Sequence, residues 1–271
     1  SIPSALSKII AEKLAKKEYR NVQKIFRCAL LYVFVVGGIA SIFLLFGAGL
    51  FLEGQAAVVL KAFAPTVFIS GFVGVLRGYF QAHGSMLQTS ISQIIEQLLN
   101  AVVSILAAYL LIRATGSTDS TDKAISGAVG STIGTGSGVL IAFIFMLCAY
   151  MLNHGYIKKR TARDQSGKVD SYRQIFGMLL SMVTPIIIST FIYNFNVSFN
   201  LVVYTKTMVH FKGFTSAQAA TQYGIFSGKS LVILNIPIAI AVAMSSAMIP
   251  AIASSRAIGD ERATNRRIEN A

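Results

Sequence analysis

Polar side chains recur at helical spacing inside one strongly apolar stretch, residues 91–105. Four of them, with Ser104 beyond, fall on one side of a helix of 3.6 residues per turn: Gln93, Glu96, Gln97 and Asn100. A carboxylate near the centre of a membrane helix costs about 2.5–3.5 kcal/mol on insertion scales, so it normally faces protein or water. We expect this face to line a cavity that contacts a polar substrate or an ion. Interhelical hydrogen bonding is the alternative.

A second polar group lies in residues 184–200, where Asn196 and Asn200 share a helix face four residues apart. Pro185 precedes them and removes a backbone donor, so it predicts a hinge in this helix. Proline-interrupted helices that carry amides are typical of transporters that alternate between two access states. Packing within a bundle explains the same residues equally well, and both interpretations stay open.

A third group lies in residues 223–250 and comprises Lys229, Asn235 and a further predicted hinge, Pro237. Lys229 stands about one turn inside the end of its apolar stretch. Its long side chain could extend to the membrane interface, or it could line a cavity as a cationic contact for phosphate. A larger loss of transport in Lys229→Ala than in Lys206→Ala would favour the cavity.

Motifs of catalytic and metal sites are absent from the sequence. There is no G-x-S-x-G, HExxH or Walker motif. Cys28 and Cys148 have no Cys or His at metal-ligand spacing. Gly130, Gly134 and Gly138 recur every four residues, a spacing that lets helices pack closely. We therefore expect no enzyme, no metal and no cofactor.

The composition indicates a membrane protein. Of 271 residues, 54% are hydrophobic and only 13% are charged, with a mean hydropathy of +0.63. A soluble domain carries about 25% charged residues. Six stretches approach or exceed the roughly 20 apolar residues that cross a bilayer: 28–52, 57–80, 89–112, 124–152, 175–204 and 224–253. The sequence predicts an all-α polytopic bundle of about six transmembrane helices.

The net charge of +13 reflects topology. If the spans alternate and the N-terminal segment is cytoplasmic, 18 basic residues lie on the cytoplasmic side and five on the outer side. Such an imbalance is the positive-inside rule, with some attraction to anionic headgroups. We therefore predict a multi-pass protein of the cell membrane that does not bind nucleic acid.

The polar segments divide the chain into five parts. Residues 1–27 predict a basic amphipathic helix, either at the membrane interface or solvated. Residues 28–152 hold four spans, 153–174 form a basic linker, 175–253 hold two spans, and 254–271 form a second basic segment. We expect the three basic parts to be cytoplasmic. Because both ends resemble loops between spans, we expect an internal piece of a longer transporter-like chain.

Residues 76–106 carry a family resemblance. The segment contains Arg77, Gly78, Tyr79, Phe80 and Gln81, then Ser92, Gln93, Glu96 and Gln97. It resembles the polysaccharide-exporter branch of the MOP flippase superfamily, among its stage V sporulation protein B-like and lipid II flippase-like members. Residues 1–27 look like that family's loop between spans two and three, and 248–255 look like the end of span eight. The resemblance implies spans three to eight of a two-lobe protein with 12–14 spans.

The resemblance also implies a function. Members of the family move lipid-linked saccharides from the inner to the outer leaflet by alternating access between two bundles. Arg77 and Lys229 would then attract pyrophosphate. The polar face of residues 93–100 would meet sugar or peptide groups, or couple H+, Na+ or the membrane potential. Expected partners are the bilayer, a lipid-linked oligosaccharide or lipid II, and cell-wall synthesis proteins. Competing classes are a cation-coupled drug exporter of the same superfamily, a membrane enzyme acting on lipid-linked sugars, and a scaffold.

Overall fold

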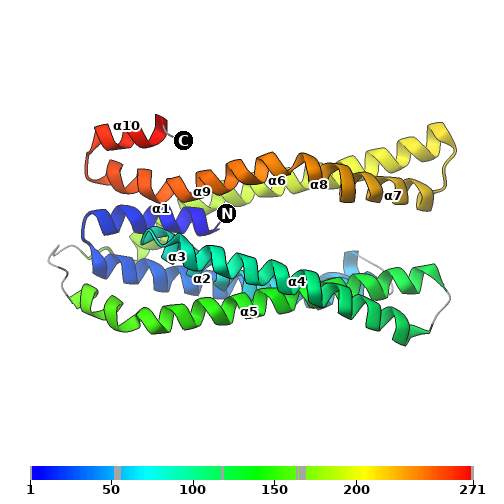
Figure 1. Cartoon of the computed structure of the whole chain (residues 1–271), viewed down its shortest axis with the longest axis horizontal. Helices are drawn as coiled ribbons and strands as arrows, with labels where there is room; N and C mark the ends of the chain where they lie inside the picture. The colour runs from blue at the N-terminus through cyan, green and yellow to red at the C-terminus, as the bar shows by residue number, and fades with distance from the viewer. Residues whose placement is uncertain (1, 52–55, 117–118, 163, 165–168, 270–271) are drawn as a thin grey trace.

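The computed structural model describes residues 2–51, 56–116, 119–162, 164 and 169–269, and every regular element in this part of the chain is a helix. Figure 1 shows two layers. The first contains α1 (Ile2–Ala15), α2 (Tyr19–Phe51), α3 (Ala56–Ala82), α4 (Met86–Thr115) and α5 (Ser120–Ala162). The second contains α6 (Tyr172–Lys212), α7 (Ser216–Ile225), the π-helical η1 (Phe226–Ser230), α8 (Leu231–Leu234), α9 (Ile236–Ala257) and α10 (Glu261–Glu269).

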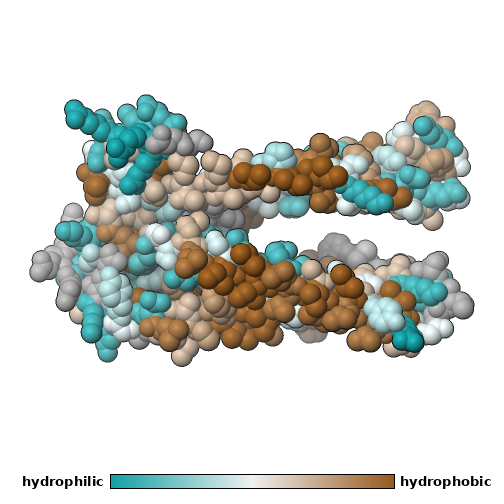
Figure 2. All heavy atoms as spheres, in the orientation of Figure 1, coloured by the Kyte–Doolittle hydropathy of each residue, from teal (hydrophilic) through white to brown (hydrophobic). Residues whose placement is uncertain are grey.

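Six of the helices are long and apolar enough to cross a membrane, which confirms the predicted fold class. Figure 2 shows apolar surface along both layers and hydrophilic surface at their ends. On α4, the side chains of Leu98, Val102 and Ile105 are more than half exposed. Helices satisfy their own backbone hydrogen bonds, so such a surface is stable in hydrocarbon. The chain is a multi-pass membrane protein.

The boundaries differ from the sequence prediction in several places. The segment 1–27, predicted as one helix, is divided between α1, which ends at Ala15, and α2, which begins at Tyr19. α5 continues to Ala162, so the first half of the predicted linker 153–174 is helical. The predicted span 224–253 is divided among the end of α7, η1, α8 and α9, and the part long and apolar enough to cross a membrane is Ile236–Ala257. A turn at Asn235 separates α8 from α9, and Pro237 lies in the first turn of α9, where its missing N–H is tolerated. By contrast, Pro185 lies inside α6 without interrupting the helix.

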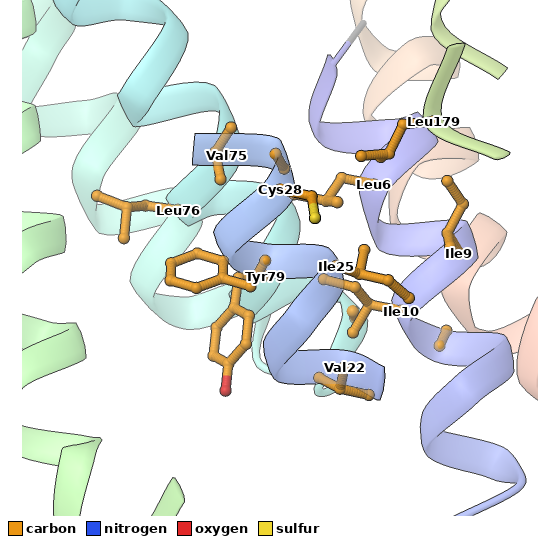
Figure 3. Close-up of a cluster of buried hydrophobic side chains, with 14 of the residues drawn as sticks. Leu6, Ile9, Ile10, Val22, Ile25, Cys28, Val75, Leu76, Tyr79 and Leu179 are labelled. Carbon is orange, nitrogen blue, oxygen red and sulfur yellow. The ribbon is translucent and has the colours of Figure 1, made fainter. Parts of the chain in front are cut away.

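The two layers join at one end, around a core that Figure 3 shows in close-up. α1 contributes Leu6, Ile9 and Ile10, all at most 2% exposed, so protein covers its apolar side chains. They pack with residues from α2, α3 and α6: Val22, Ile25, Cys28, Val75, Leu76, Tyr79 and Leu179. Away from this joint the layers separate and leave an open groove between them, visible in Figure 2. We call the joined end the basic end and the opposite end the far end.

Glycines let α4 and α5 pack backbone to backbone. A Cβ on Gly130 would overlap the backbone of Ala108, and one on Gly134 would overlap Ser104. A Cβ on Gly138 would come within 2.6 Å of the Glu96 carbonyl oxygen. The prediction that these glycines serve helix packing is confirmed.

Candidate functional site

Arg77 on α3 and Glu96 on α4 form an ion pair, with 2.6 Å between Nη2 and Oε2. Arg77 also donates from Nη2 and Nε to Ser92 Oγ, at 2.8 and 3.2 Å. The two charged side chains are only 12% and 19% exposed. The turn between the helices is short because Gly84 adopts a left-handed φ of 75°. The pair therefore neutralises two charges that would be costly alone inside a membrane.

The polar face of α4 divides into two parts. Glu96 and Asn100 turn toward neighbouring helices: Asn100 Oδ1 accepts from Thr135 Oγ1 of α5 at 3.1 Å, as well as from Ser104 Oγ of α4 itself at 2.9 Å. Gln93 and Gln97 are exposed. Glu96 and Asn100 thus each make a contact with a neighbouring helix, whereas the two glutamines remain available to whatever surrounds α4.

The other predicted site residues lie in the second layer, apart from the Arg77–Glu96 pair. Asn196 and Asn200 are exposed on α6. Lys229 is exposed within η1, and Asn235 is exposed at the break before α9. π-Helical turns are rare and often mark functional sites. The structure thus places Lys229 on irregular backbone, which the sequence analysis did not predict.

A cavity of about 790 Å³ lies between α1, α6 and α9, where the two layers meet. α1 supplies Ser4, Lys8 and Glu12, and α9 supplies Arg256. The other walls are mainly apolar: Ala5, Met182, Ile186, Ile249, Ile252 and Ala253. The sequence analysis missed this site. Its signal was the four-residue spacing of the polar residues on α1, on the face roughly opposite Ile10.

The residues that carried the family resemblance hold the helices of the first layer together near the joint. A Cβ on Gly78 would lie 2.9 Å from the Pro3 carbonyl oxygen and 3.1 Å from Leu6 Cβ, so glycine lets α1 cross α3 closely. Tyr79 is buried, and its hydroxyl accepts a hydrogen bond from Gln23 Nε2 at 2.9 Å. Together with the Arg77 pair, these contacts give this segment an architectural role.

An ionic network ties the start of α6 to α1 and α2. Lys13 Nζ lies 2.8 Å from Glu18 Oε2 and 2.5 Å from Asp170 Oδ2. Asn21 donates to Glu18 at 2.9 Å and accepts from the Asp170 backbone N–H at 2.9 Å. Burial acts to lower the pKa of Lys13, but hydrogen bonds to Asp170 and Glu18 raise it overall. Burial acts to raise the pKa of Glu18, but hydrogen bonds from Lys13 and Asn21 lower it overall.

Helices long enough to span a bilayer, arranged in two layers that meet at one end around a charged cavity, define a polytopic helical membrane protein. The chain matches the family described as "Polysaccharide biosynthesis protein" over residues 1–256, and it belongs to that family, within the MOP flippase superfamily. This membership supports a transport protein over an enzyme.

Two relatives from Bacillus subtilis (strain 168) are similar over nearly the whole chain. "Stage V sporulation protein B" is 27% identical over 257 residues, which cover 93% of this chain and 47% of the relative. "Lipid II flippase MurJ" is 23% identical over 299 residues, which cover 98% of this chain and 50% of the relative. The chain therefore spans about half the length of these curated relatives. No solved structure matches it significantly.

Proposed function

We propose that the full-length protein moves a lipid-linked saccharide, such as lipid II, from the inner to the outer leaflet of the cell membrane. The observation that carries the proposal is the cavity at the joint of the layers, which combines Lys8 and Arg256, an excess of one positive charge over Glu12, with mainly apolar walls. A polyprenyl pyrophosphate has matching parts, because its phosphates are anionic and its chain is apolar. One relative that covers nearly all of this chain is named a lipid II flippase, which favours this cargo.

The proposed mechanism is alternating access. The basic end would face the cytoplasm, in agreement with the positive-inside rule. In this structure the layers are joined at the basic end and separated at the far end. Such an arrangement would open toward the outer leaflet. Rocking of one layer against the other would close the far end and open the basic end, so the cavity at the joint would face each leaflet in turn.

The predicted site residues fit this scheme in two roles. The Arg77–Glu96 pair and Asn100 hold α3, α4 and α5 together. The exposed polar groups would meet sugar or peptide parts of the cargo as it passes: Gln93, Gln97, Asn196, Asn200, Lys229 and Asn235. H+, Na+ or the membrane potential would drive the cycle.

The test measures lipid II that is accessible on the outer surface of cells depleted of the full-length protein and complemented with variants. Lys8→Ala/Arg256→Ala should restore much less accessible lipid II than wild type does, because both cationic contacts to pyrophosphate are gone. Arg262→Ala on α10 removes an exposed charge that does not line the cavity, and it should complement fully.

Unchanged accessible lipid II on depletion would refute lipid II as the cargo. Retention of organic cations in the depleted cells, with normal accessible lipid II, would instead assign the protein to the drug exporters of the superfamily. Full complementation by Lys8→Ala/Arg256→Ala would refute the role given to the cavity.

A further inference from the structure

A second cavity, of about 680 Å³, lies at the basic end between α2, the end of α5 and the segment that leads into α6. Among the described residues, the charged ones that line it are all basic: Arg20, Lys24, Arg27 and Lys158. The remaining walls are neutral: Gln23, Ile157, Thr161, Ala162 and Val169. It shares no lining residue with the 790 Å³ cavity assigned to the cargo.

The basic residues are arranged to converge on this cavity. Arg20, Lys24 and Arg27 follow one another by four and three residues on α2, so they form a row about 10 Å long on one helix face. Lys158 comes from α5 and lines the same space. Like charges repel one another, so a cavity that collects four cations is stabilised when an anion enters it.

Nearby groups compensate these charges only in part. Lys24 Nζ donates to the Asp170 backbone oxygen at 3.0 Å and lies 4.8 Å from the centre of the Tyr172 ring. The Asp164 carboxylate accepts from the Arg20 backbone N–H at 2.6 Å. The three ion pairs seen within the described ranges all involve other side chains.

The position of the cavity favours a lipid phosphate over a soluble anion. The basic row occupies the first turns of the membrane-spanning stretch Tyr19–Gly49, and Lys158 lies just beyond the stretch Asp122–Asn153. Headgroups lie at this level of a bilayer, where basic pockets between transmembrane helices hold anionic lipids.

The same face of α2 continues as apolar surface. Leu31 and Phe34 follow Arg27 by four and seven residues, and they are 54% and 57% exposed. On α5, Met151 precedes Lys158 by seven residues and is 66% exposed. An acyl chain extending from a phosphate in the cavity would lie along these side chains.

We propose that this cavity is a binding site for the phosphate headgroup of an anionic phospholipid, distinct from the site of the transported cargo. A lipid bound there bridges α2 and α5 beside Val169, close to the beginning of α6. It would therefore bind at the junction of the two layers and couple the membrane's anionic lipid content to the stability of that junction.

Native mass spectrometry of the full-length protein, loaded with phosphatidylglycerol or with phosphatidylcholine, tests the proposal. Wild type should retain phosphatidylglycerol preferentially. Arg27→Gln/Lys158→Gln should bind phosphatidylglycerol on the order of thirty-fold more weakly, from the loss of two charges near an anionic headgroup. The matched control Lys206→Gln/Lys212→Gln removes two charges at the far end and should bind as wild type does. Arg27→Lys keeps the charge and should retain the lipid.

Three results would overturn the proposal. The first is equal weakening in the far-end control, which would show only a general charge effect. The second is equal retention of phosphatidylcholine and phosphatidylglycerol by wild type. The third is displacement of the lipid by inorganic phosphate at comparable concentration, which would show a site for free anions.

Discussion

Removal of the carboxylate of Glu96 should destabilise the first layer, because it leaves the Arg77 guanidinium with Ser92 as its remaining partner. Two unit charges about 4 Å apart interact by about 4 kcal/mol at an effective dielectric constant near 20. Loss of one member of a buried pair costs about 3–5 kcal/mol. Because the Arg77 side chain is 12% exposed and retains Ser92, we expect Glu96→Gln to lower the free energy of unfolding by about 2–3 kcal/mol.

A double-mutant cycle measures this coupling. Arg77→Met, Glu96→Gln and the double variant are unfolded by denaturant in detergent micelles as full-length proteins, with Gln97→Ala as the exposed control one position away. The double variant should be more stable than the sum of the single losses predicts, and the control should remain within about 0.5 kcal/mol of wild type. Additive single losses would refute the reasoning, because they would mean that the two side chains do not interact.

Four further outcomes are expected. Gly134→Leu should abolish the packing of α4 on α5 and prevent recovery of folded protein, whereas Gly155→Ala, which meets no atom within 4 Å, should be recovered normally. Since the pKa of Glu18 is lowered from 4.5 in the folded protein, its stabilising contribution is complete above that pH and is lost as pH falls through the lowered value. The protection of the Asp170 backbone N–H against hydrogen exchange should therefore fall in acid but not near pH 7, and Glu18→Gln should remove that acid dependence. The pKa of Lys13 is raised from 10.5, so Lys13 is charged and stabilising at neutral pH. Lys13→Met should therefore lower the same amide protection already at neutral pH. Because Gln97 is exposed, Gln97→Cys should react readily with a water-soluble maleimide. Protection of this cysteine from the reagent would contradict the exposure of this face.

The spans were predictable because hydropathy and length are properties of a single stretch of sequence. All six predicted spans fall on helical segments, although the last is broken. The glycine spacing of residues 130–138 also predicted a close helix contact, since each glycine removes a side chain from the same face. Hydropathy, however, does not show where a helix ends. It did not predict that α5 continues through charged sequence as far as Ala162.

The partner of each polar residue could not be predicted. The sequence predicts both Arg77 and Glu96 as cavity residues, but it does not show that they pair. They meet because the turn after α3 places α4 antiparallel beside it. The same holds for α1, whose pattern suits a membrane surface as well as a protein groove. The π-helical turn at Lys229 depends on how the backbone hydrogen bonds are shifted, and Gly228 alone is too common a signal for it.

The close crossing at Gly78 determines which of the two sides of α1 can move against its neighbours. α1 touches α3 without an intervening side chain there, so the two helices should travel as one rigid piece. On its other side, α1 lines the 790 Å³ cavity together with α6 and α9. Movement between the layers would therefore concentrate on the α1–α9 side, and α1 would act as a pivot fixed to one layer. A bulky residue at Gly78 would loosen that pivot without touching the cargo cavity.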